Sequence, residues 1–214
     1  MTDYICASPR REKSAAYLLL KRLQKLQNDR CAVRMWDENM GSSFADTAVL
    51  SFPLYIDGIP AQLLCALRDL PKGAYKKIYA LSTCGFYEGE QIGLAFETLQ
   101  NFCLKTGRVF CGGLGVGAGG LICGVRYLPD ALHPHRKAFM ELRRFSQHLA
   151  SGMPFENVYT DPAIPRRAYM FFVDASFRRR ARRALFAAEF GKNAQSDAQN
   201  DCKSCKNLDK RRRL

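Results

Sequence analysis

The sequence predicts an α/β protein built on a doubly wound, five-stranded parallel sheet. Short apolar segments alternate with amphipathic helical segments from the start of the chain, which is typical of βαβ units. With 214 residues, of which 47% are hydrophobic and 25% are charged, the chain can bury one full core and carry an appendage. We expect the strand order 2-1-3-4-5, one of the two common orders of such sheets.

The strands are predicted from short runs rich in apolar residues. The third run is apolar almost throughout, as expected of a strand that is buried on both faces. The five predicted strands are Tyr4–Ala7, Cys31–Trp36, Thr47–Phe52, Lys77–Ser82 and Arg108–Val116.

The helices are predicted from apolar residues at intervals of three and four and from their end signals. Ser14 suits the N-cap of the first helix because its hydroxyl can accept a backbone N–H, and Pro60 suits the start of the second. The four helices of the sheet domain are predicted at Ala15–Leu26, Pro60–Leu70, Glu90–Thr106 and Ala131–Ala150.

The remaining chain is predicted to be an appendage. We expect a domain over residues 1–152, a linker and basic helix over residues 153–190, and a disordered basic tail over residues 191–214. Residues 166–214 hold 14 Lys and Arg against 5 Asp and Glu, whereas residues 1–165 hold 19 against 15. The formal charge of +13 therefore belongs mainly to the C-terminal quarter. This quarter is expected to be a solvated docking helix or, as the weaker alternative, to approach an anionic membrane surface or nucleic acid.

The chain is expected to be cytoplasmic. The start lacks the pattern of a signal peptide, and no apolar run is long enough to span a bilayer. The nine cysteines are an odd number and lie mostly in apolar segments, so we expect buried free thiols.

Three loops are candidates for a ligand site, because open α/β sheets bind ligands at the carboxyl ends of their strands. The first, Ser8–Ser14, opens a helix and offers N–H groups, the Ser8 and Ser14 hydroxyls and the Arg10 guanidinium to a phosphate. The other two, residues 53–60 and 82–88, combine prolines, glycines and large apolar side chains that could flank a flat ring. An ordinary capped turn and two plain loops are the alternatives.

Together these loops resemble the flavodoxin-like NAD(P)H-dependent oxidoreductases, the FMN reductases and their quinone-reducing relatives. The resemblance spans residues 3–190 and also includes the glycine-rich segment Cys111–Gly117 and, more loosely, Ile164-Pro165-Arg166. The family usually has glycine where this chain has Ala7. The residues that the resemblance assigns to FMN are Ser8, Arg10, Ser14, Pro53, Leu54, Tyr55, Ile56, Thr83, Cys84, Gly85 and Phe86.

The resemblance implies an FMN-dependent oxidoreductase that passes electrons from NAD(P)H to a quinone, flavin or other small acceptor. Such enzymes are often dimers, so it also implies a homodimer. The flavin carries the chemistry, and no catalytic side chain is nominated. The alternatives are a non-enzymatic flavodoxin-type electron carrier, which is usually acidic, and a flavin-free scaffold with an anion-binding tail.

Three other features are weaker signals. The stretch Gly115–Gly120 matches G-x-G-x-x-G, but it follows the fifth strand and we expect no helix directly after it. The pair Cys202 and Cys205 cannot complete a four-ligand zinc site, so no metal is predicted. The three histidines, His133, His135 and His148, are expected at the surface.

Overall fold

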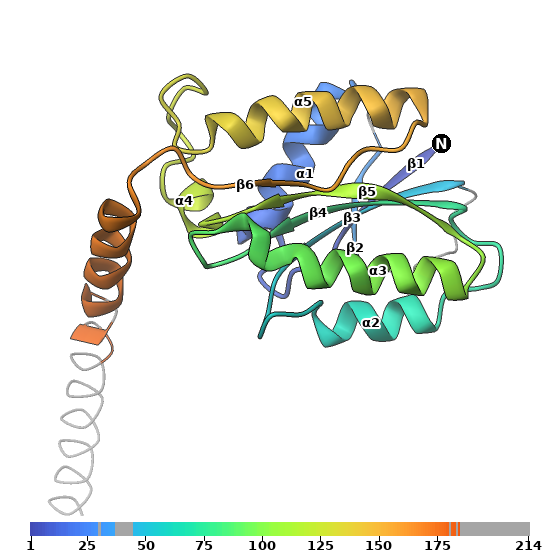
Figure 1. The fold of residues 1–214 in the computed structure, drawn as a ribbon, viewed down its shortest axis with the longest axis horizontal. Coiled ribbons are helices and arrows are strands. Elements are labelled where there is room, and N and C mark those ends of the chain that lie inside the picture. Colours follow the sequence, from blue (N-terminus) through green and yellow to red (C-terminus); the bar gives the residue numbers. More distant parts are fainter. Residues whose placement is uncertain (30, 37–44, 180, 183, 185–214) are drawn as a thin grey trace, which may run out of the picture. The chain divides into compact units, whose positions relative to one another are not determined.

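The computed structural model describes residues 1–29, 31–36, 45–179, 181, 182 and 184. The chain forms two compact units, Met1–Ile164 and Pro165–Leu214. The first unit is a parallel sheet covered by helices on both faces (Figure 1). In the second unit, residues 166–179, 181, 182 and 184 are helical, and the predicted disordered tail lies outside the described residues.

The sheet has six strands in the order β2-β1-β3-β4-β5-β6, and every neighbouring pair is parallel. The predicted order of the first five is confirmed, but the predicted number of strands is wrong. The strands are β1 (Thr2–Cys6), β2 (Val33–Met35), β3 (Thr47–Pro53), β4 (Lys77–Thr83), β5 (Val109–Val116) and β6 (Val158–Thr160).

The sixth strand lies in the segment predicted to be a linker, and glycine explains how it fits. Gly112 has a φ of +92°, and a Cβ there would lie 1.7 Å from the carbonyl oxygen of Phe155. The Phe155 N–H donates to the carbonyl of Cys111 at 2.7 Å, so this crossing is close and fixed. Strand β6 then continues alongside β5, with Gly115 opposite Tyr159.

The helices occupy the predicted regions. The first has the predicted bounds, the other three begin one to five residues later than predicted, and the last of them also ends one residue later. Ser14 caps α1 as predicted: its hydroxyl accepts the N–H of Tyr17. The observed elements are η1 (Arg11–Lys13), α1 (Ala15–Leu26), α2 (Ala61–Arg68), η2 (Gly89–Ile92), α3 (Gly93–Lys105), α4 (Gly119–Gly124) and α5 (Arg136–Ser151).

Two apolar clusters form the core, one on each face of the sheet. Successive strand residues alternate between them, as the pleat requires: Ile78 faces α2 and α3, whereas Tyr79 faces α1 and α5. Buried residues such as Phe96 of α3 and Phe145 of α5 complete the two layers. This packing holds the strand ends rigidly, and the loops that follow them form the candidate site.

Candidate functional site

The three loops named from the sequence leave the same edge of the sheet. Strands β1, β3 and β4 are neighbours and end in register, since Cys6 pairs with Ser51 and Pro53 pairs with Thr83. Backbone hydrogen bonds continue past the strand ends, from the Ala7 N–H to Ser51 and from the Leu54 N–H to Thr83. The sheet therefore brings the three predicted loops together.

The first loop, between β1 and α1, is folded tightly on itself. Ser8 and Ser14 are buried, and Ser8 Oγ accepts the N–H of Arg10 at 3.3 Å. The Ser14 hydroxyl donates to the carbonyl of Arg11 at 2.7 Å while it caps α1. Because the hydroxyl proton of Ser14 is used in this internal hydrogen bond, it is not available to a ligand. The exposed Arg10 is the better placed donor for an external anion.

The second loop, between β3 and α2, contains a strained two-residue turn. Tyr55 and Gly58 exchange two backbone hydrogen bonds of 3.0 Å, and the residues between them are Ile56 (φ +47°) and Asp57 (φ +56°). Positive φ at both central positions defines a type I′ turn, which favours Asn and Gly and is costly for a β-branched residue. The Ile56 side chain is nonetheless fully exposed, and Tyr55 is 42% exposed.

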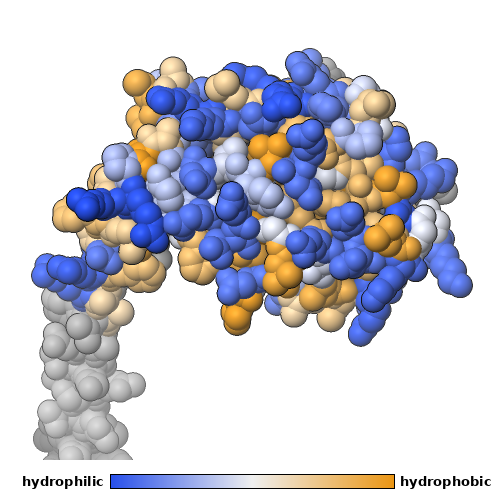
Figure 2. Space-filling view, in the orientation of Figure 1, coloured by the Kyte–Doolittle hydropathy of each residue, from blue (hydrophilic) through white to orange (hydrophobic). Residues whose placement is uncertain are grey.

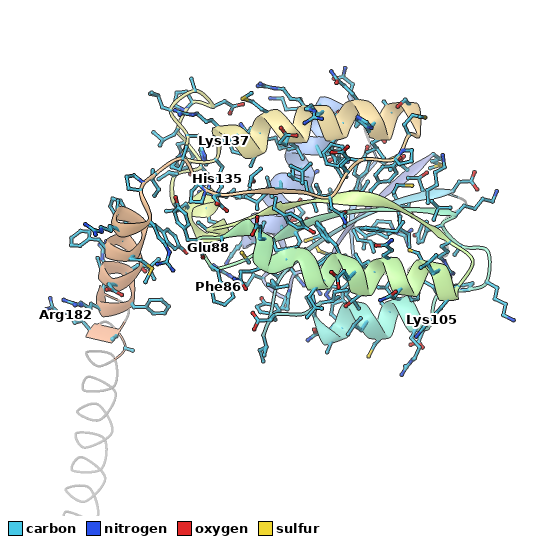
Figure 3. All side chains as sticks on the ribbon, viewed as in Figure 1. Phe86, Glu88, Lys105, His135, Lys137 and Arg182 are labelled. Carbon is cyan, nitrogen blue, oxygen red and sulfur yellow. The ribbon has the colours of Figure 1, made fainter. Side chains whose placement is uncertain are left out.

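The third loop, between β4 and η2, combines a buried start with an exposed tip. Thr83 and Cys84 are buried, Gly85 has open space where a Cβ would lie, and Phe86 is 51% exposed (Figure 3). The Gly119 N–H donates to the carbonyl of Cys84 at 2.8 Å, which joins this loop to the start of α4.

Cys84 is a structural thiol in this loop. Its Sγ donates to the carbonyl oxygens of Glu88 at 3.4 Å and Phe86 at 3.6 Å. Burial raises the pKa of the Cys84 thiol to about 11, so the group is protonated at neutral pH. A protonated, buried thiol is a poor nucleophile, so Cys84 shapes the loop.

The edge therefore presents two kinds of surface side by side. The first loop offers a permanent cation, and the second and third offer three exposed large apolar side chains: Tyr55, Ile56 and Phe86. Leu54, also expected at the flavin, is almost wholly buried. This combination suits a ligand with an anionic end and a flat apolar body.

The prediction that the histidines are at the surface is wrong for two of them. His133 and His135 are buried, and the backbone N–H of His135 donates to ring Nδ1 of His133 at 3.0 Å. Burial lowers the pKa of both rings, that of His135 to about 4. One signal of this burial is the run His-Pro-His directly before α5, where the proline fixes the backbone.

The glycine-rich stretch after β5 has a packing role. A Cβ on Gly117 would lie 2.1 Å from the carbonyl oxygen of Tyr87, and one on Gly119 would lie 2.9 Å from Cβ of Thr83. The expectation that no helix follows directly is wrong, because α4 begins at Gly119. That helix has only six residues, and the glycines let the loops after β4 and β5 approach each other.

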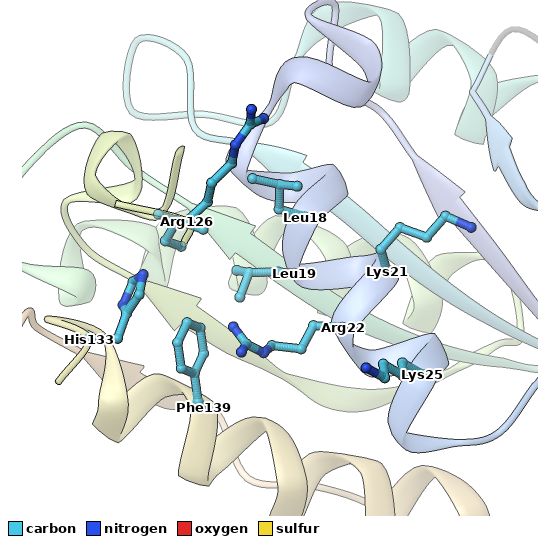
Figure 4. Close-up of a pocket in the computed structure, with 9 residues that line it drawn as sticks. Leu18, Leu19, Lys21, Arg22, Lys25, Arg126, His133 and Phe139 are labelled. Atoms are coloured by element: carbon cyan, nitrogen blue, oxygen red, sulfur yellow. The ribbon is translucent and has the colours of Figure 1, made fainter. Parts of the chain in front are cut away.

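A separate hollow of about 330 Å³ is lined by residues of α1, α4 and α5 (Figure 4). Leu18, Leu19, Ile122 and Phe139 form its apolar part, and basic side chains, among them Arg22, surround them. Arg22 already pairs with Asp130 and stacks on the Phe139 ring, 3.8 Å from its centroid. This charge thus serves the packing of α1 against α5.

The architecture and its edge site define a flavodoxin-like fold. Comparison with models of known protein families and with curated protein sequences finds no match. Solved structures do match, and they include flavodoxin-like NAD(P)H:FMN and quinone oxidoreductases and azoreductases at low sequence identity.

Three of these structures illustrate the likeness. The apo form of an NADH:FMN oxidoreductase is 16% identical and covers 78% of this chain and 97% of its own, with a TM-score of 0.52. The Trp repressor binding protein from Bacillus subtilis is 11% identical and covers 67% and 99%, also with a TM-score of 0.52. A short-chain flavodoxin associated with a bacterial microcompartment is 14% identical and covers 71% and 98%, with a TM-score of 0.50. The fold is thus shared with an NADH:FMN oxidoreductase.

Proposed function

We propose that this protein is an FMN-dependent oxidoreductase that passes electrons from NAD(P)H to a small acceptor such as a quinone or a flavin. The observation that carries the proposal is the pairing of charge and apolar surface at the carboxyl edge of the sheet. The exposed Arg10 lies in the first loop there, and the exposed Tyr55, Ile56 and Phe86 lie in the second and third loops. The fold shared with an NADH:FMN oxidoreductase supports the same conclusion.

The residues at the edge fit FMN in their donor chemistry. Arg10 offers a guanidinium fork to the phosphate, and the helix that starts at Ala15 adds the positive end of its dipole. Tyr55, Ile56 and Phe86 offer apolar surface to the isoalloxazine, and Gly85 leaves room for close approach of its backbone. When bound, FMN supplies two-electron redox chemistry that no protein side chain provides.

The protein's own contribution is binding and orientation. Cys84, in the third loop, is protonated at neutral pH because burial raises its pKa to about 11. The apolar side chains at the edge exclude water from one side of the ring, and the buried strand ends hold the loops in place. No acid or base from the protein is needed for hydride transfer to a flavin.

The experiment is to load the purified protein with FMN and follow NADH and NADPH oxidation with menadione as acceptor. Steady oxidation that requires both protein and FMN is the expected result. A control variant outside the three loops, Lys105→Gln at the end of α3, should oxidise NAD(P)H as fast as the native chain. A flavin-loaded protein that does not turn over would instead be an electron carrier, and a protein that takes up no FMN would overturn the proposal.

A further inference from the structure

The helix of the second unit exposes large apolar side chains over most of its length. Met170, Phe171, Phe172 and Phe177 are all exposed, Phe171 by 71% and Phe177 by 62%. Single exposed apolar residues are ordinary, but four large ones on one short helix indicate an interaction surface.

These side chains include an ordered stripe. Met170, Val173, Phe177 and Ala181 follow one another at intervals of three or four residues, which places them on one face of a helix. The exposed Asp174 lies on this face too, and Phe171 and Phe172 lie on other faces of the helix. The stripe extends over about three turns. Large apolar side chains are therefore exposed on more than one side of this helix.

The rest of the helix is strongly cationic. Residues 166–184 contain seven arginines, one aspartate (Asp174) and no other charged residue. Arg178 and Arg182 are four residues apart and exposed, next to the apolar stripe, and hydrophobic and hydrophilic residues lie side by side on this helix in Figure 2. Arginine stems can lie along an apolar boundary while their charged ends reach outward.

We infer that this helix binds the surface of a membrane that contains anionic lipids. Exposed apolar side chains such as Met170 and Phe177 enter the boundary of the acyl chains, and the arginines pair with the headgroups. A second copy of the helix fits poorly, because the same excess of positive charge would face itself. Among the described residues no helix is both long and apolar enough to cross a bilayer.

Co-sedimentation of the full chain with lipid vesicles tests this inference. We expect binding to vesicles of phosphatidylcholine mixed with phosphatidylserine, weak binding to phosphatidylcholine alone, and a decrease as salt is added. Arg178→Gln with Arg182→Gln should weaken binding by about thirtyfold. Met170→Ser with Phe177→Ser should weaken it by about tenfold or more.

Two matched variants separate this effect from a general loss of charge or of folding. Arg178→Lys with Arg182→Lys keeps the charge and should keep the binding. Lys72→Gln with Lys105→Gln removes the same charge from the first unit and should leave the binding unchanged.

Three results would overturn the inference. They are no binding to either vesicle, equal binding to neutral and anionic vesicles, and binding that the serine variants leave unchanged. In the last case a single-stranded RNA competitor that releases the protein would identify the helix as a nucleic-acid contact, which needs arginines and no apolar stripe.

Discussion

Nε2 of His135 lies 2.9 Å from the carbonyl oxygen of Gly117, in the loop that follows β5. Because a carbonyl only accepts, this contact places the ring proton on Nε2 and leaves Nδ1 as an acceptor. Nδ1 is buried and has no hydrogen-bond partner within the described part of the chain. Protonating His135 would thus add a buried charge at the junction of α5 and the edge loops.

The first prediction follows from this junction. Burial lowers the pKa of His135 to about 4 in the folded protein, against about 6.5 in an unfolded chain. The neutral ring thus contributes stability that is fully present above about pH 6.5 and is lost as the pH falls toward 4. The loss should be about 3 kcal/mol.

Urea unfolding at a series of pH values measures this loss. His135→Gln should flatten the dependence between pH 6.5 and 4. An equally steep dependence in the His135 variant would assign the titration to other groups.

The second prediction concerns the turn at Ile56 and Asp57. Both have positive φ, so replacing them by Asn and Gly should raise the free energy of unfolding by about 1–2 kcal/mol. The same change removes an exposed apolar side chain from the proposed flavin edge, so FMN affinity should fall. A variant that gains stability and loses FMN affinity would show that the strained backbone of this turn contributes to FMN binding.

The control for this turn is Leu94→Asn on α3. Leu94 is exposed like Ile56, but it lies in an ordinary helix, so this change should not stabilise the protein. If the Asn-Gly turn is no more stable than the native turn, the backbone there stores no strain.

The third prediction concerns Tyr55. Its ring is half-exposed beside the strained turn, and stacking on a flat ring contributes about 0.5–1.5 kcal/mol beyond burial. Tyr55→Ala should weaken FMN binding by roughly tenfold and alter the visible absorption of the bound flavin. Tyr127→Ala, another exposed tyrosine outside the three loops, should do neither. An unchanged spectrum and an unchanged FMN affinity in the Tyr55 variant would show that Tyr55 does not contact the flavin.

The fourth prediction concerns the end of the chain. Residues 192–214 are polar and charged and include the cluster Lys210-Arg211-Arg212-Arg213. Cutting after Gly191 should leave flavin content, thermal stability and NAD(P)H oxidation unchanged, while salt-sensitive binding to anionic surfaces decreases. If the shortened protein lost flavin or turnover, this segment would belong to the site.

Most of the sheet and the position of the three loops could be predicted from the sequence. Strands such as Thr47–Pro53 and Lys77–Thr83 are buried on both faces, so their apolar runs are unambiguous, and the carboxyl edge follows from the topology. The N-cap at Ser14 was equally clear, because capping depends on local sequence.

The features that were missed depend on contacts between distant segments. Strand β6 has only three residues, and it forms because the glycines of β5, such as Gly112, let the later chain come close. The burial of His135 depends on the loop at Gly117, and the internal bond of the Ser14 hydroxyl depends on the turn at Arg11. None of these partners can be identified from a local pattern.

The central claim is that the edge formed by the loops after β1, β3 and β4 binds FMN, with its phosphate at Arg10. The most direct test is to titrate the protein with FMN and with riboflavin while recording the visible spectrum, for the native chain and for Arg10→Ala. The account predicts saturable binding of FMN and weaker binding of riboflavin, because charge-assisted bonds to the phosphate contribute about 1.5–3 kcal/mol each. In Arg10→Ala the affinity for FMN should fall while that for riboflavin stays nearly the same. No saturable FMN binding would contradict the claim, and an equal loss of both ligands in the variant would contradict the phosphate position.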